Sequence, residues 1–256
     1  MVPSDAETGA REVFESPIAA YPAAGRSFES ERRVELGDCD PSGRARLDAI
    51  ARWLQEVAYD DVSDAGLAAG GLWIARRARI RVEGFPSFGE PIALRTACSA
   101  SGRLVAERRT DVSAPRSGAR ISAVALWVHV DPETRVPARL GEAFDAVYAP
   151  SAEGRRARSG LRHTGEPPAG ALTREWFFRR ADLDIAGHVN NAAYWAIAEE
   201  LLGDAPLEWL DAEIEYRDGI GPGVARVAVA GGSIRVLDVG GASLAASIEL
   251  RVPSAR

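Results

Sequence analysis

The chain has 256 residues, of which 46% are hydrophobic and 27% are charged, and its formal net charge is −6. These values are typical of a globular protein with a sizeable core, in one large domain or two small ones. The negative net charge argues against a general nucleic-acid binder, and no apolar run approaches the roughly 20 residues that a membrane span needs. The acidic, polar N-terminus lacks the apolar region of a signal peptide, so we expect a cytoplasmic protein.

Cysteine and histidine are few and scattered. The chain has two cysteines, Cys39 and Cys98, and three histidines, and none of their spacings is typical of a metal or redox site. We also find no glycine-rich phosphate loop and no dinucleotide-binding fingerprint. The sequence therefore predicts a reduced protein with no metal and no cofactor. All basic residues other than histidine are arginines, which, with the many alanines and glycines, suggests a GC-rich bacterial genome.

The first part of the chain predicts a tail, a strand and a long helix. Residues 1–24 are polar and rich in Pro and Ala, and we expect them to form a loose tail. A strand-like segment begins at Arg26. The helix is predicted by one apolar stripe at helical spacing, and Gly66 marks its end. The stripe consists of Leu47, Ile50, Ala51, Leu54, Val57 and Ala58.

Segments of strand-forming residues follow, separated by Gly, Pro and Ser. The strands predicted here are Leu72–Glu83, Pro91–Ser99, Arg103–Ser113 and Ala119–Asp131. We take residues 25–150 as a first domain with the order strand, long helix and strand meander. Residues 151–171 have little apolar content and many Gly, Pro, Ser and Arg residues, which predicts a linker.

The same order then repeats in residues 172–256, the second predicted domain. A strand at Arg174–Arg180 leads into a loop and a helix, and more strands follow at Leu207–Arg217, Gly223–Ala230, Ser233–Val239 and Ser243–Val252. Both halves carry a D-x-D-x-x-G motif directly before the helix, at a constant spacing. The matching residues are Asp38, Asp40, Gly43 and Glu56 in the first half and Asp182, Asp184, Gly187 and Glu200 in the second. An internal duplication explains this agreement.

At these positions the sequence resembles the acyl-ACP thioesterase family of plant plastids and bacteria, over about residues 26–250. The first half carries WLQEVA, GFPSFGEPIALRTACSASGRLVAERR and ALWVHVDPETRVPARL, and the second carries DLDIAGHVNNAAYW and IEYRDGIG. The resemblance implies an α+β fold, a tandem double hotdog in which each half wraps an antiparallel sheet around a long helix. It also implies hydrolysis of acyl-ACP thioesters in fatty acid biosynthesis, with the acyl chain bound in the N-terminal half and catalysis in the C-terminal half.

Thioester hydrolysis needs a polarised carbonyl oxygen and an activated water. Glycine lets the backbone approach a ligand, so the N–H groups of Gly187, His188 and Val189 are candidates for the oxyanion hole. Asp184, four residues before His188, could act as general base or orient the imidazole. By resemblance, Asp184 and His188 match two positions of the family's catalytic set. Asn190 and Asn191 could cap the helix, or one of them could bind the pantetheine amide.

The second half also departs from the family pattern. Ala186 stands where the family has Asn, and Gly219 and Ile220 stand where it has Glu and, in plants, Cys. Asp218 could replace the Glu if the strand bulges there, since a shift by one residue otherwise points to the opposite face. Glu199, Glu200 and Glu215 are further candidate carboxylates. The first half has Arg44 in place of His188, which predicts that it is not catalytic.

Two other functions stay open. A hotdog hydratase or dehydratase would use similar Asp and His chemistry, and a non-catalytic acyl-thioester binder would fit the losses at Ala186 and Gly219. An acidic acyl carrier protein or a CoA thioester could be the partner, and the chain could be a monomer or a homodimer. A basic docking face could come from arginine-rich stretches at 76–81, 108–109 and 155–158. Trp53, Trp73 and Trp127 could limit the acyl chain length, or simply pack the core.

Overall fold

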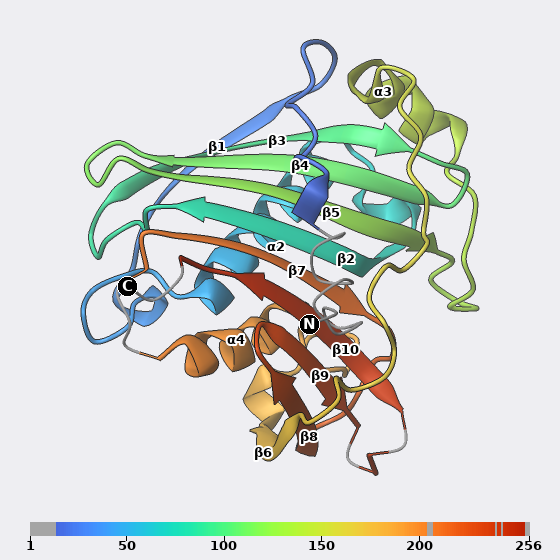
Figure 1. Cartoon of the computed structure of the whole chain (residues 1–256). Coiled ribbons are helices and arrows are strands. Elements are labelled where there is room, and N and C mark those ends of the chain that lie inside the picture. Colours follow the sequence, from blue (N-terminus) through green and yellow to red (C-terminus); the bar gives the residue numbers. More distant parts are fainter. Residues whose placement is uncertain (1–13, 204–206, 239, 242, 254–256) are drawn as a thin grey trace.

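Ten strands form one antiparallel sheet across both halves of the chain (Figure 1). The computed structural model describes residues 14–203, 207–238, 240–241 and 243–253. The strand order is β1-β3-β4-β5-β2-β7-β10-β9-β8-β6. β2 and β7 are the central pair, and this pair joins the two halves into a single sheet.

The strands and helices of the first half follow the predicted order. They are β1 (Phe28–Arg33), α2 (Leu47–Asp64), β2 (Leu72–Glu83), β3 (Pro91–Ser101), β4 (Val105–Ala114) and β5 (Ala119–Val130). Those of the second half are β6 (Leu172–Phe178), a 3-10 turn η4 (Asn191–Tyr194), α4 (Trp195–Leu202), β7 (Trp209–Tyr216), β8 (Gly223–Ala230), β9 (Ser233–Leu237) and β10 (Leu244–Arg251). The bounds of β2 and β8 are those predicted from the sequence, and the other strands agree to within a few residues.

The two halves are related by a pseudo-twofold axis between β2 and β7. Outward from β2, the first half has β5, β4, β3 and β1. Outward from β7, the second half has β10, β9, β8 and β6, which are the equivalent strands in the same order. In the central register, Ala78 is opposite Ile214 and Ile80 is opposite Ala212. These apolar residues face the helices, and the residues between them carry charge. The tandem double hotdog expected from the resemblance is therefore confirmed.

One hydrophobic core extends through both halves, because both helices pack on the same face of the sheet (Figure 1). α2 buries Leu47, Ile50, Trp53 and Val57 almost completely, at 0–2% exposure. α4 packs against α2 and buries Trp195 and other side chains beside it. Burial of one such large side chain contributes roughly 1.5–3 kcal/mol to stability. Because α2 and α4 bury these side chains partly against each other, each half depends on the other for part of its core.

The helix of the second half is shorter than expected. α4 has 8 residues and follows the 3-10 turn η4 directly, whereas α2 has 18 residues. Gly203, with a φ of 60°, ends α4. With a ψ of −154°, its backbone adopts a conformation that is open almost only to glycine. The expectation of a long helix is therefore wrong for this half.

A helix not predicted from the sequence closes the first half. α3 (Glu142–Ala152) includes Pro150, and its last residues overlap the predicted start of the linker. It buries Phe144 and Tyr148 beside Cys98 in a second, smaller core. Burial raises the pKa of Tyr148 to about 12. The helix was not predicted because Pro150 disfavours a helix and the polar residues after it are typical of a linker.

The expected loose tail packs against the sheet where it is described. Phe14 is 6% exposed, and the guanidinium of Arg79 lies 5.1 Å from its ring centre. Arg79 also donates a hydrogen bond to the carbonyl of Ser16 at 2.7 Å. Residues 14–16 therefore cover part of the face opposite the helices, while residues 1–13 lie outside the described part. None of the described helices is long and apolar enough to cross a membrane.

Candidate active site

Each half contains the same tight turn before its helix. In the second half, the N–H of Asp184 donates to the carbonyl of His188 at 2.9 Å, and that of Gly187 donates to the carbonyl of Asp184 at 3.0 Å. The first half repeats both bonds in Asp40, Arg44 and Gly43, at 2.9 and 3.0 Å. Gly43 and Gly187 have φ values of 85° and 80°, which explains why the motif needs glycine there. The duplication inferred from the sequence thus extends to individual hydrogen bonds.

The turn of the first half is closed by ion pairs. The Asp40 carboxylate accepts hydrogen bonds from Ser42 and from the Arg44 backbone and guanidinium. Burial alone would raise the pKa of Asp40, but these bonds outweigh it and lower the pKa below its ordinary value. Arg44 also binds Glu199, which extends from α4 in the other half. Every charged group of this turn has a partner, so the first half offers no free acid or base here.

The turn of the second half instead presents an exposed histidine. His188 is exposed to solvent, and its imidazole packs against the backbone of Gly219, just beyond the end of β7. A Cβ added at Gly219 would lie 3.0 Å from Cγ and 3.1 Å from Nδ1 of this ring. The space in which a side chain at position 219 would begin is therefore occupied by the imidazole. His188 and Gly219 meet here from distant parts of the chain.

The Asp184 carboxylate holds the same turn together. Its Oδ1 atom accepts a hydrogen bond from the N–H of Ala186 at 2.8 Å, and the side chain is half-buried. Within the described residues it forms no ion pair with His188. The two groups therefore share one turn without direct contact, which leaves Asp184 Oδ2 available to a water or a substrate. Asp182, predicted to be structural, binds the backbone N–H and the guanidinium of Arg179.

Two of the three candidate oxyanion donors are already engaged. The N–H of Gly187 donates to Asp184, and the N–H of Val189 donates to the carbonyl of Ile220 at 2.8 Å. In this structure the turn uses both N–H groups for its own backbone pairing, so neither is a free donor. The N–H of His188 makes no hydrogen bond to any described residue. The corresponding N–H of Arg44 in the first half donates to Asp40.

The two asparagines at the helix start have different roles. Asn190 caps the turn, since its side chain accepts a hydrogen bond from the N–H of Ala192 at 2.8 Å. Asn191 gives its backbone carbonyl to the Tyr216 hydroxyl at 3.0 Å, and this hydroxyl accepts a bond from the Trp195 indole at 3.1 Å. Burial raises the pKa of Tyr216 far above its ordinary value. Tyr216 thus stays neutral and fixes the position of Asn191, a role that the sequence analysis missed.

Asp218 follows a bulge in the chain. The N–H groups of Arg217 and Asp218 both donate to the carbonyl of Ala245, at 2.8 and 3.3 Å. Two successive donors on one carbonyl are typical of a β-bulge, which turns the following side chains away from strict alternation. The role of Asp218 at the site stays a prediction. Its side chain is exposed, and its neighbour Gly219 contacts His188.

A mainly apolar pocket lies between α2, the sheet and the start of the second-half helix, and its lining includes Asn191 but not Asp184, His188 or Asp218. Ala51, Leu54, Gln55 and Ala58 of α2 line one side. Asn191 and Trp195 of the second half and Trp127 of β5 also line it. Trp127 therefore borders the pocket, whereas Trp53 packs the core and Trp73 stacks with Phe144 in the smaller one. The pocket extends from the His188 half into the first half.

Four arginines of the predicted basic docking face are buried and cannot contribute to it, whereas Arg81, Arg156 and Arg158 are exposed. Arg77, Arg79, Arg108 and Arg109 are all buried, at 5–8% exposure. Arg79 pairs with Asp211 at 2.8 Å across the central strands, and Arg108 pairs with Asp61 at 2.6 Å. These arginines neutralise acidic side chains inside the molecule instead of facing an acidic partner.

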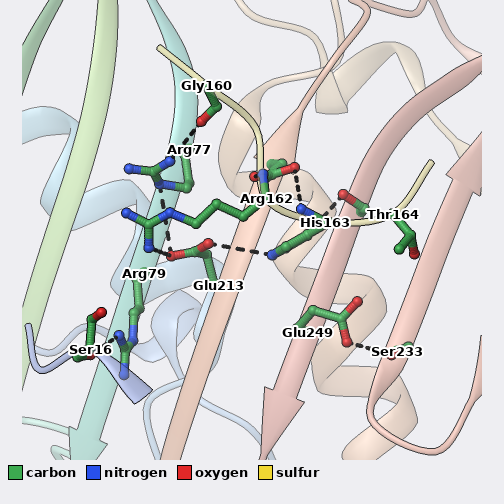
Figure 2. A network of polar contacts seen from close by, with 12 residues as sticks. Ser16, Arg77, Arg79, Gly160, Arg162, His163, Thr164, Glu213, Ser233 and Glu249 are labelled. Carbon is green, nitrogen blue, oxygen red and sulfur yellow. Dashed lines mark hydrogen bonds and ion pairs between the residues drawn. The ribbon is translucent and has the colours of Figure 1, made fainter. Parts of the chain in front are cut away.

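A buried polar network joins the linker to the outer face of the central strands (Figure 2). The predicted linker lies across this face, and its His163 is 7% exposed. His163 Nδ1 is 2.9 Å from the Ser247 hydroxyl, and Nε2 is 3.4 Å from Glu213 Oε1. Glu215 accepts hydrogen bonds from the backbone N–H groups of Arg162 and His163. Glu215 is therefore a structural residue on the face opposite the pocket.

The same network contains a possible set of metal ligands. Atoms of His163, Glu213 and Glu215 lie within 4.8 Å of one another. Arg77 and Arg162 each lie 3.8 Å from Glu213, and Arg217 lies 3.4 Å from Glu215. These guanidinium groups already balance the two carboxylates, which disfavours a further cation. We interpret the cluster as a structural contact that holds the linker on the sheet.

The double hotdog with an apolar pocket is the architecture of proteins that bind acyl thioesters, and the family match gives the class as thioester hydrolases. Residues 25–148 match the model of the acyl-ACP thioesterase N-terminal domain, and residues 166–223 match that of the C-terminal domain. The chain belongs to the acyl-ACP thioesterase family. The family resemblance inferred from the sequence is thereby confirmed.

The chain is similar to individual proteins from several organisms. An uncharacterized protein of Mycobacterium tuberculosis is 30% identical over 209 residues, covering 80% of this chain and 83% of the relative. The chloroplast oleoyl-acyl carrier protein thioesterase 2 of Arabidopsis thaliana is 30% identical over 224 residues, covering 75% of this chain and 59% of that protein. The structure of the 12:0-ACP thioesterase of Umbellularia californica has the same fold, with a TM-score of 0.68, 20% identity and coverage of 91% and 100% of the two chains.

Proposed function

We propose that this chain hydrolyses acyl-ACP thioesters at the turn that holds Asp184 and His188. Water adds to the thioester carbonyl carbon, the carbon–sulfur bond breaks, and the carrier leaves as a thiol and the acyl group as a free fatty acid. Family membership supports the reaction class. In the proposal, Asp184 and His188 activate the water and return a proton to the leaving thiolate. Asp218, beyond the bulge, is the further carboxylate beside this site.

The observation that carries the proposal is the asymmetry between the two duplicated turns. In the first half, Arg44 is bound by both Asp40 and Glu199. In the second half, the residue at the same place is His188, whose imidazole is exposed and whose backbone N–H makes no hydrogen bond to any described residue. Only the second turn can therefore exchange protons with a substrate. The adjoining pocket is apolar, which suits an acyl chain that enters the first half.

Release of free thiol from acyl-ACP and acyl-CoA substrates of medium to long chain tests the proposal. Thiol release that is lost in Asp184→Asn and in His188→Ala would support it and would identify the preferred carrier. Binding of acyl-ACP without thiol release would contradict it and would instead indicate an acyl-thioester binding protein. The N-terminal variant Arg44→Ala is the matched control for the second turn, because Arg44 stands at the place of His188.

A further inference from the structure

One polar side chain interrupts the apolar side of the pocket. The residues of α2 that line it, at positions 51, 54, 55 and 58, have the spacing of one helix face. Three of them are apolar, and the fourth is Gln55. Gln55 is half-buried, and its carboxamide makes no hydrogen bond within the described part of the chain. Because the amide is only half-buried, water can bind it, and a polar group of a ligand in the pocket can take the place of that water.

The pseudo-twofold axis identifies what Gln55 faces. Its counterpart in the second half is Glu199, in the register that pairs Asp40 with Asp184. The Glu199 carboxylate crosses to the opposite half, where it binds the guanidinium of Arg44 and accepts the N–H of Leu47 at 2.9 Å. In the same register the counterparts of Arg44 and Leu47 are His188 and Asn191. The symmetry therefore places Gln55 above the second turn, near these two residues.

The pocket supports this placement independently, because Gln55 and Asn191 line it together. Glu199 is engaged by the first turn, whereas Gln55 lacks a protein partner at the second. A carboxamide is neutral and cannot serve as a base, but its N–H groups can donate to a carbonyl oxygen. The proposed reaction creates negative charge on such an oxygen.

We propose that Gln55 of the first half binds the reacting thioester, with its amide donating a hydrogen bond to the carbonyl oxygen. This rests on the proposed hydrolysis at the second turn. The site is then completed by both halves, and the first half contributes to the reaction as well as to the acyl pocket. A donor directed at the developing oxyanion strengthens as charge builds up, so it acts mainly on turnover.

Variants of Gln55 test this role. Gln55→Ala should lower kcat by roughly 100-fold, the effect typical of removing one oxyanion donor, with a much smaller change in KM. Gln55→Glu has nearly the same shape but no N–H to donate, and it should be similarly impaired. Asp60→Ala, on the exposed side of the same helix, is the control. Thermal unfolding of all variants should coincide with that of the wild type.

A second measurement separates this inference from the proposed hydrolysis. The affinity for an acyl-pantetheine amide, which keeps the carbonyl but resists hydrolysis, should fall by about 5-fold or more in Gln55→Ala, as loss of one hydrogen bond predicts. If the wild type released no thiol, the proposed hydrolysis would fail, yet this affinity would still report on Gln55. Unchanged kcat and unchanged affinity in folded Gln55→Ala would overturn the inference.

Discussion

Arg44 in the first half binds the carboxylate of Glu199 in the second half, and the same carboxylate accepts the backbone N–H of Leu47 at the start of α2. One side chain thus holds an ion pair and a helix start of the opposite half at once. Acidic groups at a helix N-terminus are favourable because the first N–H groups lack partners within the helix. This contact ties the two hotdogs together beside the pocket.

Removal of this contact should destabilise the protein. Glu199→Ala leaves the partly buried guanidinium of Arg44 and the first N–H of α2 without this partner, and we expect a loss of about 1–3 kcal/mol in unfolding free energy. Urea denaturation measures it. Glu200→Ala, which changes the exposed neighbour on α4, should have little effect. Equal losses in the two variants would show that the contact between the halves does not stabilise the fold.

The proposed acid–base pair predicts a large effect on turnover. Asp184→Asn and His188→Ala should each lower kcat by about 100-fold or more, because each removes a proton-transferring group. Rates of thiol release per folded molecule, with circular dichroism as a check on folding, measure this. The matched change in the first turn, Asp40→Asn, should leave kcat within a few-fold. A folded His188→Ala variant with the wild-type rate would exclude the histidine from the chemistry.

The contact between His188 and Gly219 predicts that even a methyl group matters. In Gly219→Ala the new Cβ would lie about 3 Å from the imidazole, so the ring must shift. We expect kcat to fall by roughly 10-fold, since small misplacements of a reacting group are costly. Gly221→Ala, where a Cβ meets no atom within 4 Å, is the control. Equal rates for both variants would mean that the position of the ring is not critical.

The contact of His163, Glu213 and Glu215 between linker and sheet should contribute to stability and not to catalysis. His163→Ala leaves the Ser247 hydroxyl without its buried partner and removes one of the groups that face the buried Glu213 carboxylate. We expect unfolding at about 1–3 kcal/mol lower free energy, with kcat unchanged. Arg158→Ala, an exposed linker residue, should leave both unchanged. Loss of activity in His163→Ala without loss of stability would contradict the structural role of this network.

The carboxylates of the duplicated turns predict the response to acid. Burial would raise the pKa of Asp182, but hydrogen bonds from Arg179 outweigh it and lower the pKa below the ordinary 3.8. The unfolded chain then takes up protons first as pH falls, so stability is fully present above about pH 4 and is lost as pH falls through the lower, folded pKa. Asp182→Asn removes this contribution. Its unfolding free energy should lie below that of the wild type at neutral pH and approach it at acid pH, whereas a constant difference would contradict the pKa shift.

Local patterns in the sequence determined much of the fold. Alternation and turn residues predicted β2 and β8 at their observed bounds, because a strand that faces a core on one side leaves a period of two. The repeated D-x-D-x-x-G motif predicted two equal turns, because its hydrogen bonds form within a few residues of each other. Asp184 and His188 could be predicted as site residues for the same reason, together with the family resemblance.

Contacts between distant segments were decided only by the tertiary structure. The arginines at 77 and 79 look like surface charges in sequence, but the linker and residues 14–16 bury them. The N–H groups of Gly187 and Val189 look free until the turn and Ile220 engage them. In the sequence Gln55 is one polar residue on a helix. Only the pseudo-twofold arrangement of the two halves shows that its counterpart is Glu199 and that it lines the pocket. Sequence spacing specifies which residues share a face, but burial and pairing depend on what packs against that face, and here that came from the other half of the chain.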